Sequence, residues 1–285
     1  MRRLSLVPIL MMSLCLGVNA AQAIPIWTAY NDFAGPKSTG NVTNISRDPA
    51  DRPAGAAIGP SGTLVKFLDN SSTGVLLTIT GLVDNWNFLP LQGNYSAGAT
   101  DVNTYFGSPG STVSPLGMTD HGTHANHTIT LTFTGLDVNG SYSFTLFANR
   151  EADPDSPGNT RWMRGQIQDI DSFSNASSSG AKVIRKTQAM FEDTTAVNII
   201  NTRATGEVTR YTNIRPGSDG DMIVFLDSPI DGVTIPLGNF SNWTEINLMR
   251  LDLDAIVPEP STYALALLGL VGLACVALRK KFRRA

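Results

Sequence analysis

Three histidines lie close together near the middle of the chain, and histidine is a common metal ligand. His121, His124 and His127 are all the histidines of the 285-residue chain, and Asp120 precedes the first of them. Neutral imidazoles and a carboxylate bind Zn²⁺ or Cu²⁺. If His127 begins a strand, a spacing of three residues puts successive histidines on opposite faces, so a loop must gather them. A polar loop is the first interpretation of this segment, and a metal site formed by these four residues is the alternative.

A second group of candidates has the side chains that bind sugars. The stretch from Asp84 to Asn126 holds aromatic residues among Gly, Asn, Ser and Pro, without a strand pattern. Irregular segments of this length are usually functional or disordered. The rings either stack on sugar faces or pack on the domain as a small satellite core, and the area that aromatic residues bury favours packing. The ligand-binding candidates are Trp86, Tyr95 and Tyr105.

Two arginines enclose an acidic segment. Arg150 and Arg161 lie on either side of Glu151, Asp153 and Asp155. The first interpretation is a charged hairpin loop with solvated ion pairs. The second is that either arginine binds a sugar hydroxyl or a partner's carboxylate through its planar guanidinium.

No motif singles out a catalytic residue. The chain has no Gly-x-Ser-x-Gly elbow, no His-Glu-x-x-His and no phosphate-binding glycine loop. A glycosidase needs two carboxylates about 5–10 Å apart, which a β sequence does not reveal. Asp219-Gly220-Asp221 is expected to be an ordinary β-turn. The acidic candidates for a hydrolase are Asp120, Glu151, Glu192, Glu207 and Glu245.

The hydrophobic period is two residues, which is typical of strands. Residues 128–134 and 142–147 alternate, and Leu136 to Gly140 joins them through an Asn-Gly dipeptide typical of hairpins. Asn175 to Gly180 is expected to be a flexible loop. Short strands with Gly, Asn, Ser and Pro turns predict an all-β antiparallel sandwich or barrel without long helices. Further strands are expected at Ile26–Phe33, Leu64–Leu68, Val75–Thr80, Met163–Gln168, Ala196–Ile200, Met222–Leu226 and Ile246–Leu253.

The central part of the chain is acidic and free of cysteine. Cys15 and Cys275 lie in apolar segments at the two ends, so residues 24–256 have no disulfide and no thiolate ligand. Omitting seven terminal cations leaves 21 − 7 = 14 basic residues, and omitting Glu259 leaves 24 − 1 = 23 acidic ones. The charge is 14 − 23 = −9, against −3 for the whole chain. This charge disfavours nucleic acid and suits neutral glycans or divalent cations.

The N-terminal end has the parts of a signal peptide. Arg2 and Arg3 precede the apolar run from Leu4 to Val18, and Ala21-Gln22-Ala23 is a small-x-small site. We predict cleavage after Ala23 by signal peptidase, with residues 1–23 as the signal peptide.

The C-terminal end has three parts. Pro258-Glu259-Pro260 should stay extended because two prolines fix φ and remove backbone donors. Residues 262–278 are 17 in number and uncharged, at the short end of the roughly 17–25 that span a bilayer. The basic tail at 279–284 should remain cytoplasmic, which places the domain outside. An ordinary C-terminal anchor is the alternative to a processed signal.

These three parts resemble a PEP-CTERM sorting domain over residues 257–285. The resemblance implies a Gram-negative bacterium that makes exopolysaccharide. It also implies an exosortase that recognises and cleaves the chain near Pro258, Glu259 and Pro260. Such proteins resemble one another at this tail and differ elsewhere, so the tail transfers no biochemical activity.

A second resemblance concerns residues 24–256. Leu136, Tyr142 to Arg150, Arg161-Trp162, Gly165 and Ile246 to Leu251 are similar to a pattern in many PEP-CTERM ectodomains. That pattern resembles galactose-binding-like jelly rolls. It implies a jelly-roll-like sandwich, sugar binding at loop tips and a structural Ca²⁺.

We therefore expect an exported β-sandwich that passes through the inner membrane and reaches the cell surface or extracellular matrix. Its expected role is non-catalytic, with exopolysaccharide as the ligand. The alternative is a secreted hydrolase of extracellular polysaccharide.

Overall fold

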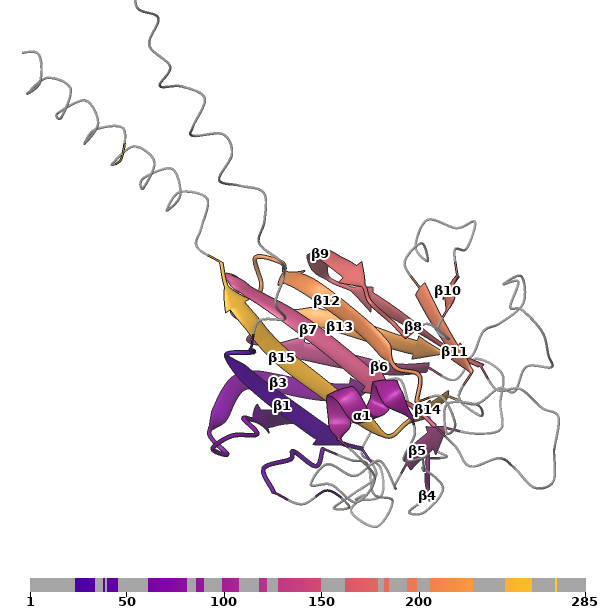
Figure 1. Cartoon of the computed structure of the whole chain (residues 1–285). Coiled ribbons are helices and arrows are strands. Elements are labelled where there is room, and N and C mark those ends of the chain that lie inside the picture. Colours follow the sequence, from indigo (N-terminus) through magenta and orange to yellow (C-terminus); the bar gives the residue numbers. More distant parts are fainter. Residues whose placement is uncertain are drawn as a thin grey trace, which may run out of the picture.

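A computed structural model describes residues 24–33, 38, 40–45, 61–80, 86–89, 99–107, 118–121, 128–149, 162–178, 182–184, 194–198, 206–227, 244–257 and 270. These residues form fifteen strands and one short helix (Figure 1). The predicted all-β class is therefore confirmed.

The strands form two large antiparallel sheets and one small one. The front sheet has five strands, in the order β1 (Trp27–Asp32), β15 (Leu248–Ile256), β7 (Gly140–Phe147), β12 (Thr209–Pro216) and β9 (Ile170–Asn175). The rear sheet has seven, in the order β10 (Lys182–Ile184), β11 (Thr194–Asn198), β8 (Trp162–Gln168), β13 (Met222–Asp227), β6 (Thr128–Thr134), β3 (Ser72–Thr80) and β2 (Ser61–Val65). The small sheet has three, in the order β14 (Thr244–Ile246), β5 (Met118–His121) and β4 (Trp86–Leu89).

The front and rear sheets pack face to face on one hydrophobic core. In β6, Ile129, Leu131 and Phe133 are fully buried and the threonines between them are partly exposed, as the alternation predicts. Phe133 meets Phe144 of the front sheet edge to face, with ring centroids 5.7 Å apart. Each large apolar side chain buried in this way contributes about 1.5–3 kcal/mol. Burial of these rows stabilises the sandwich.

The expected hairpin between β6 and β7 is wrong, because the chain crosses from the rear sheet to the front sheet there. The turn itself forms, and the N–H of Gly140 donates to the carbonyl of Asp137 at 2.7 Å. The Asn-Gly dipeptide marks a tight turn, but the core decides which strands pair. For the same reason Arg150 and Arg161 do not enclose a hairpin, since β7 and β8 lie in different sheets.

The sequence pattern misses β4, β5, β9, β10 and β12, and the first two of these lie within the stretch expected to be irregular. Alternation in β12 is broken at Asn213, whose φ of 54° accompanies shifts of register toward both neighbouring strands. The flexible loop expected from Asn175 is instead fixed as far as Ser178. There the N–H of Ala176 donates to Arg210 O at 2.9 Å, and Ser178 Oγ accepts the N–H of Val208 at 2.7 Å.

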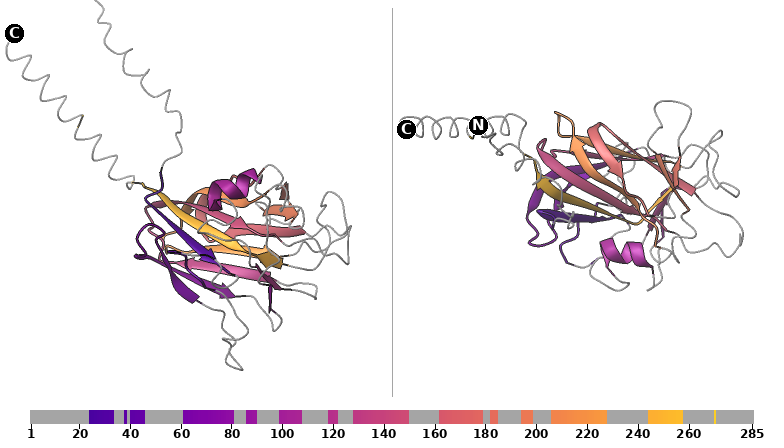
Figure 2. Two further views of the ribbon diagram at one scale, coloured as in Figure 1. Left: turned by 60° about the horizontal axis from the view of Figure 1, so that its bottom comes forward. Right: turned by 45° about the horizontal axis from the view of Figure 1, so that its top comes forward.

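A short helix, α1 (Thr100–Phe106), covers part of the outer face of the front sheet (Figure 2). It lies within the stretch for which no regular structure is expected. Val102 and Phe106 are buried against Phe147 and Leu248. The satellite-core interpretation of this stretch is therefore confirmed for Phe106.

The two ends of the sandwich differ. β1 begins and β15 ends at one end, here called the terminal end, and the strands next to them meet there through short turns (Figure 1). The turns are at residues 66–71, 135–139, 169 and 217–221. At the opposite, far end, long segments separate β3 from β6, β7 from β8 and β13 from β14. The far end also carries the small sheet.

Among the residues that the structure describes, no helix is long and apolar enough to cross a membrane. The membrane segment predicted at residues 262–278 lies outside them apart from Leu270. That segment stays a prediction.

Gly220 fixes the contact between two turns of the terminal end. Its φ is +73°, and a Cβ there would lie 2.5 Å from the carbonyl oxygen of Leu136. Gly220→Ala should lower the free energy of unfolding of residues 24–257 by about 2–4 kcal/mol, because strain and overpacking act together. Gly217→Ala is the control, since its Cβ would meet only the ends of two side chains, Asp219 Oδ1 at 3.2 Å and Asp171 Oδ1 at 4.0 Å. Urea denaturation followed by tryptophan fluorescence measures the free energy of unfolding of both variants. Equal values would contradict a close contact between Gly220 and Leu136.

Candidate functional site

The small sheet brings two acidic residues to one register position. Asp120 of β5 pairs with Glu245 of β14 and, on its other side, with Asn87 of β4. Directly opposite residues of an antiparallel pair have Cβ atoms about 4.5–5.5 Å apart. Two hydrolase candidates that are distant in the sequence are thus neighbours in the fold. No local motif signals this pairing.

The next position of the same sheet pairs Trp86 with His121. A predicted sugar-stacking residue and a predicted metal ligand are therefore adjacent. Asp120 and His121 are successive residues of β5 and belong to different cross-strand rows. His124 and His127 lie outside the described residues. The metal site stays a prediction.

Tyr105 is part of the domain's own packing. Its ring packs against the cluster under α1, and the guanidinium of Arg210 lies over it, 4.5 Å from the centroid. A cation over an aromatic face is attracted by the ring's quadrupole. One face of this ring is thus occupied from within the protein, which favours the packing interpretation at Tyr105.

A charged network ties the last turn of α1 to the front sheet. Arg250 Nε donates to both carboxylate oxygens of Asp252 at 2.9 Å, and Thr28 Oγ1 donates to Asp252 Oδ1 at 2.5 Å. Arg250 Nη1 also donates to the carbonyl of Tyr105 at 3.0 Å. Burial lowers the pKa of Arg250, but the charges of Asp252, Tyr30 and Asp254 and the hydrogen bond to Asp252 together outweigh it, so the pKa lies above its ordinary value. A cation at the helix C-terminus also satisfies a carbonyl that has no partner within the helix.

The network extends along the same face toward the terminal end. Arg210 Nη1 donates to Thr145 Oγ1 at 2.7 Å, and Ser143 Oγ donates to Asp254 Oδ2 at 2.6 Å. Burial raises the pKa of Asp254, and the hydrogen bond from Ser143 opposes this shift. These contacts connect polar side chains across β7, β12 and β15. These contacts hold the strands of the outer face and α1 together. In the sequence, the network is signalled by the alternation of Arg250, Asp252 and Asp254 with leucines in β15.

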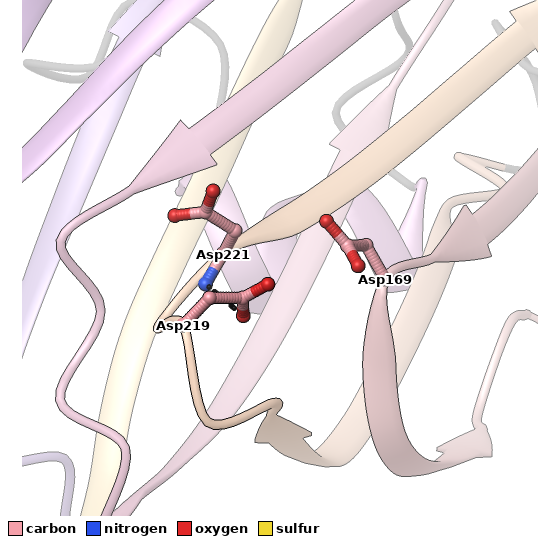
Figure 3. Close-up of side chains that lie close together, drawn as sticks. All are labelled: Asp169, Asp219 and Asp221. Atoms are coloured by element: carbon pink, nitrogen blue, oxygen red, sulfur yellow. Dashed lines mark hydrogen bonds between the residues drawn. The ribbon is translucent and has the colours of Figure 1, made fainter.

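Three carboxylates meet at the terminal end (Figure 3). One oxygen each of Asp169, Asp219 and Asp221 lies within 4.8 Å of the others. Asp219 and Asp221 flank Gly220 in the turn before β13, and Asp219 Oδ1 accepts the N–H of Asp221 at 3.2 Å. Asp169 joins them because a φ of 59° turns the chain sharply between β8 and β9. The plain β-turn expected at 219–221 therefore has a third carboxylate beside it.

This acidic cluster is mostly exposed, and it offers three of the six to eight oxygen ligands that Ca²⁺ takes. Burial raises the pKa of Asp221, and the charges of Asp219 and Asp169 raise it further. The three carboxylates of this cluster lie close enough to one another to bind a single cation. The structural Ca²⁺ implied by the jelly-roll resemblance stays a prediction.

The end of β15 is held on both sides. β15 lies between β1 and β7 in the front sheet. The N–H of Ile26 donates to Leu253 O at 2.7 Å, and the N–H of Val257 donates to Asn139 O at 2.7 Å. Backbone hydrogen bonds therefore hold the chain as far as Val257, the residue before Pro258.

Several sites predicted from the sequence lie outside the described residues, and each stays a prediction. They are the signal-peptidase site Ala21 and Ala23, the sorting residues Pro258, Glu259 and Pro260, and the ligand-binding candidates Tyr95, Arg150 and Arg161.

Comparison with known proteins identifies one segment. Residues 257–284 match the PEP-CTERM protein-sorting motif, which confirms the resemblance inferred from the sequence. The protein is therefore an exported one with a C-terminal membrane-anchor region that an exosortase processes. No curated protein and no solved structure matches the chain.

Burial and repulsion in the acidic cluster predict a pH dependence of stability. The pKa of Asp221 is raised on folding, so its ionisation destabilises the folded state as pH rises above the unfolded value of about 3.9. Asp221→Asn should raise Tm at pH 7 by about 1–2 °C, and the gain should vanish near pH 3. Melting curves of the variant and the unchanged domain from pH 3 to 8 measure this difference in Tm. The buffer contains a chelator, which removes divalent cations.

Asp69→Asn is the matched control of opposite sign. Ser71 donates its hydroxyl and its N–H to Asp69, and these bonds lower the pKa of the carboxyl. Its ionised form stabilises the fold above the unfolded pKa, and this is lost as pH falls through the folded pKa. Asp69→Asn should therefore lower Tm at pH 7. A fall in Tm for Asp221→Asn under the same conditions would show that the ionised carboxylate of Asp221 stabilises the fold and would contradict the raised pKa.

Proposed function

Starting from a chain that ends in a PEP-CTERM sorting motif, we propose a non-catalytic, carbohydrate-binding protein of the cell surface or extracellular matrix. Signal peptidase removes residues 1–23, an inner-membrane intermediate forms, and an exosortase delivers residues 24–256. The observation that carries the proposal is the position of the motif, which begins at residue 257 directly after β15 ends at Ile256. The anchor therefore leaves the domain from the terminal end.

The far end is then the surface that meets extracellular polymer. The strand ends that flank the aromatic, histidine-rich and Arg150–Arg161 segments lie there, with the small sheet beside them. Loops carried by a rigid sandwich are a common place for binding residues. Trp86 and its register partner His121 suit a neutral sugar, which presents an apolar face and hydroxyls. A jelly-roll-like sandwich that binds exopolysaccharide of its own host agrees with these features and with the charge of −9.

A hydrolase of extracellular polysaccharide is the second candidate, and the pairing of Asp120 with Glu245 favours it. Retaining glycosidases hold two carboxyl groups about 5–5.5 Å apart. Release of reducing ends from the host polysaccharide, abolished by Glu245→Gln, would decide for this candidate.

Binding of the exported domain to the host polysaccharide tests the leading proposal. Trp86→Ala should weaken binding by at least about tenfold, because tryptophans at the centre of an interface carry much of the binding energy. Trp27→Phe is the control, since Trp27 lies at the terminal end with its ring 6.0 Å from that of Tyr142. Affinity electrophoresis in gels that contain the polysaccharide measures both variants. An equal loss for both, or no retardation of the unchanged domain by any polysaccharide, would contradict carbohydrate binding.

A further inference from the structure

Exposed aliphatic side chains gather at the terminal end. Among the described residues of the domain, five of the large hydrophobic side chains that stay exposed lie in its turns and strand ends. A sixth, Leu76, is 38% exposed and lies within β3. The five form what we call the end face: Ile24 (90% exposed), Ile26 (57%), Leu68 (93%), Val138 (47%) and Ile256 (46%).

The end face surrounds the point where the chain leaves the domain. Ile256 pairs with Gly140, and the N–H of Val257 is bonded to Asn139, the residue after Val138. The N–H of Ile26 is bonded to Leu253 of the same strand. Leu68 follows Phe67, whose N–H donates to Thr28 O at 2.8 Å. Single exposed aliphatic residues are ordinary, but a group around one exit point marks an interaction surface.

The length of chain beyond the domain limits what can lie opposite. From Val257 to Thr262, where the predicted membrane segment begins, five residue steps span at most about 18 Å. The polar layer of a bilayer takes up roughly 5–8 Å of that length. Pro258 is one Cα step, about 3.8 Å, from Val257. An enzyme that holds the Pro-Glu-Pro segment must therefore touch the end face.

Such an enzyme cannot bind β15, the strand before the motif, as an extended peptide. β15 is an inner strand whose two edges pair with β1 and β7. Enzymes that bind a peptide by adding it to a sheet need a free strand edge. Recognition on the domain side of Pro258 must therefore use the folded surface.

The charge of this end opposes docking on anionic lipid. The turns at the terminal end carry five carboxylates and one lysine, so their side-chain charge is 1 − 5 = −4. The carboxylates belong to Asp69, Asp137, Asp169, Asp219 and Asp221, and the lysine is Lys66. Like charges at an interface cost several kcal/mol, whereas a basic protein surface is complementary.

We infer that the end face, ringed by these carboxylates, is a docking surface for the sorting exosortase, whose facing surface is apolar at its centre and basic around it. The inference rests on the proposed sorting by this enzyme and adds a folded determinant to the linear motif. It requires the sandwich to be folded before the motif is processed.

Processing of the full-length precursor in its exosortase-bearing host tests the inference. The double variant Leu68→Asn, Val138→Asn removes two aliphatic groups that are distant in sequence from both cleavage sites. Its rate of conversion to the processed form, followed by pulse-chase, should fall by about fivefold or more. Leu76→Asn is the matched control and should be processed at the normal rate. Equal melting temperatures of the processed domains would exclude a folding defect.

Two further variants separate the inference from the proposed function. Pro258→Ala, Pro260→Ala should block processing if the motif directs sorting. A block there, with normal processing of the double variant, would overturn the docking surface and leave sorting intact. Normal processing of the motif variant would overturn both.

The Asp219→Lys variant distinguishes the enzyme from the lipid surface. Slower processing is expected if the facing surface is basic. Flotation of the processed domain with vesicles rich in anionic lipid, strengthened by Asp219→Lys, would identify lipid as the partner and overturn the inference.

Discussion

The pairing of the last strand with the first is the constraint on which the rest of the structure depends. β15 lies between β1 and β7, and both pairings are antiparallel. The chain therefore enters and leaves the sandwich at one end. Leu251 and Leu253 of this strand face the core. Arg250 and Asp252, which alternate with them, lie on the outer face and hold α1 there. One strand thus contributes to the core, positions the helix and sets the exit point of the sorting motif.

This constraint separates the two ends by role. The terminal end has short turns held by backbone contacts, such as Gly220 against Leu136. The far end has long connections and a small sheet in which Asp120, Trp86 and their register partners meet. Short turns suit an end that faces an anchor and a processing enzyme. Long loops on a rigid scaffold suit an end that meets varied extracellular ligands.

Local patterns predict local structure, and pairing between distant strands is where prediction from this sequence stops. Strict alternation identifies β6, and the break at Asn213 conceals β12. The Asn139-Gly140 turn is correctly predicted. The strands that it joins enter different sheets, because burial of both faces of β7 outweighs the local hairpin signal. The site follows the same rule. The sorting motif is contiguous and readable, whereas the meeting of Asp120 with Glu245, or of Asp169 with Asp221, depends on register and turn geometry.

The two segments that we propose to be removed join the domain at the same end, so that their removal leaves the sandwich intact. On this proposal the mature protein consists of the folded domain alone. Mass spectrometry of the protein from the cell-surface fraction tests this most directly. We expect an N-terminus at Ile24 and a C-terminus near Pro258 to Pro260. A surface protein that still ends at Ala285 would contradict this expectation and show a permanent tail anchor.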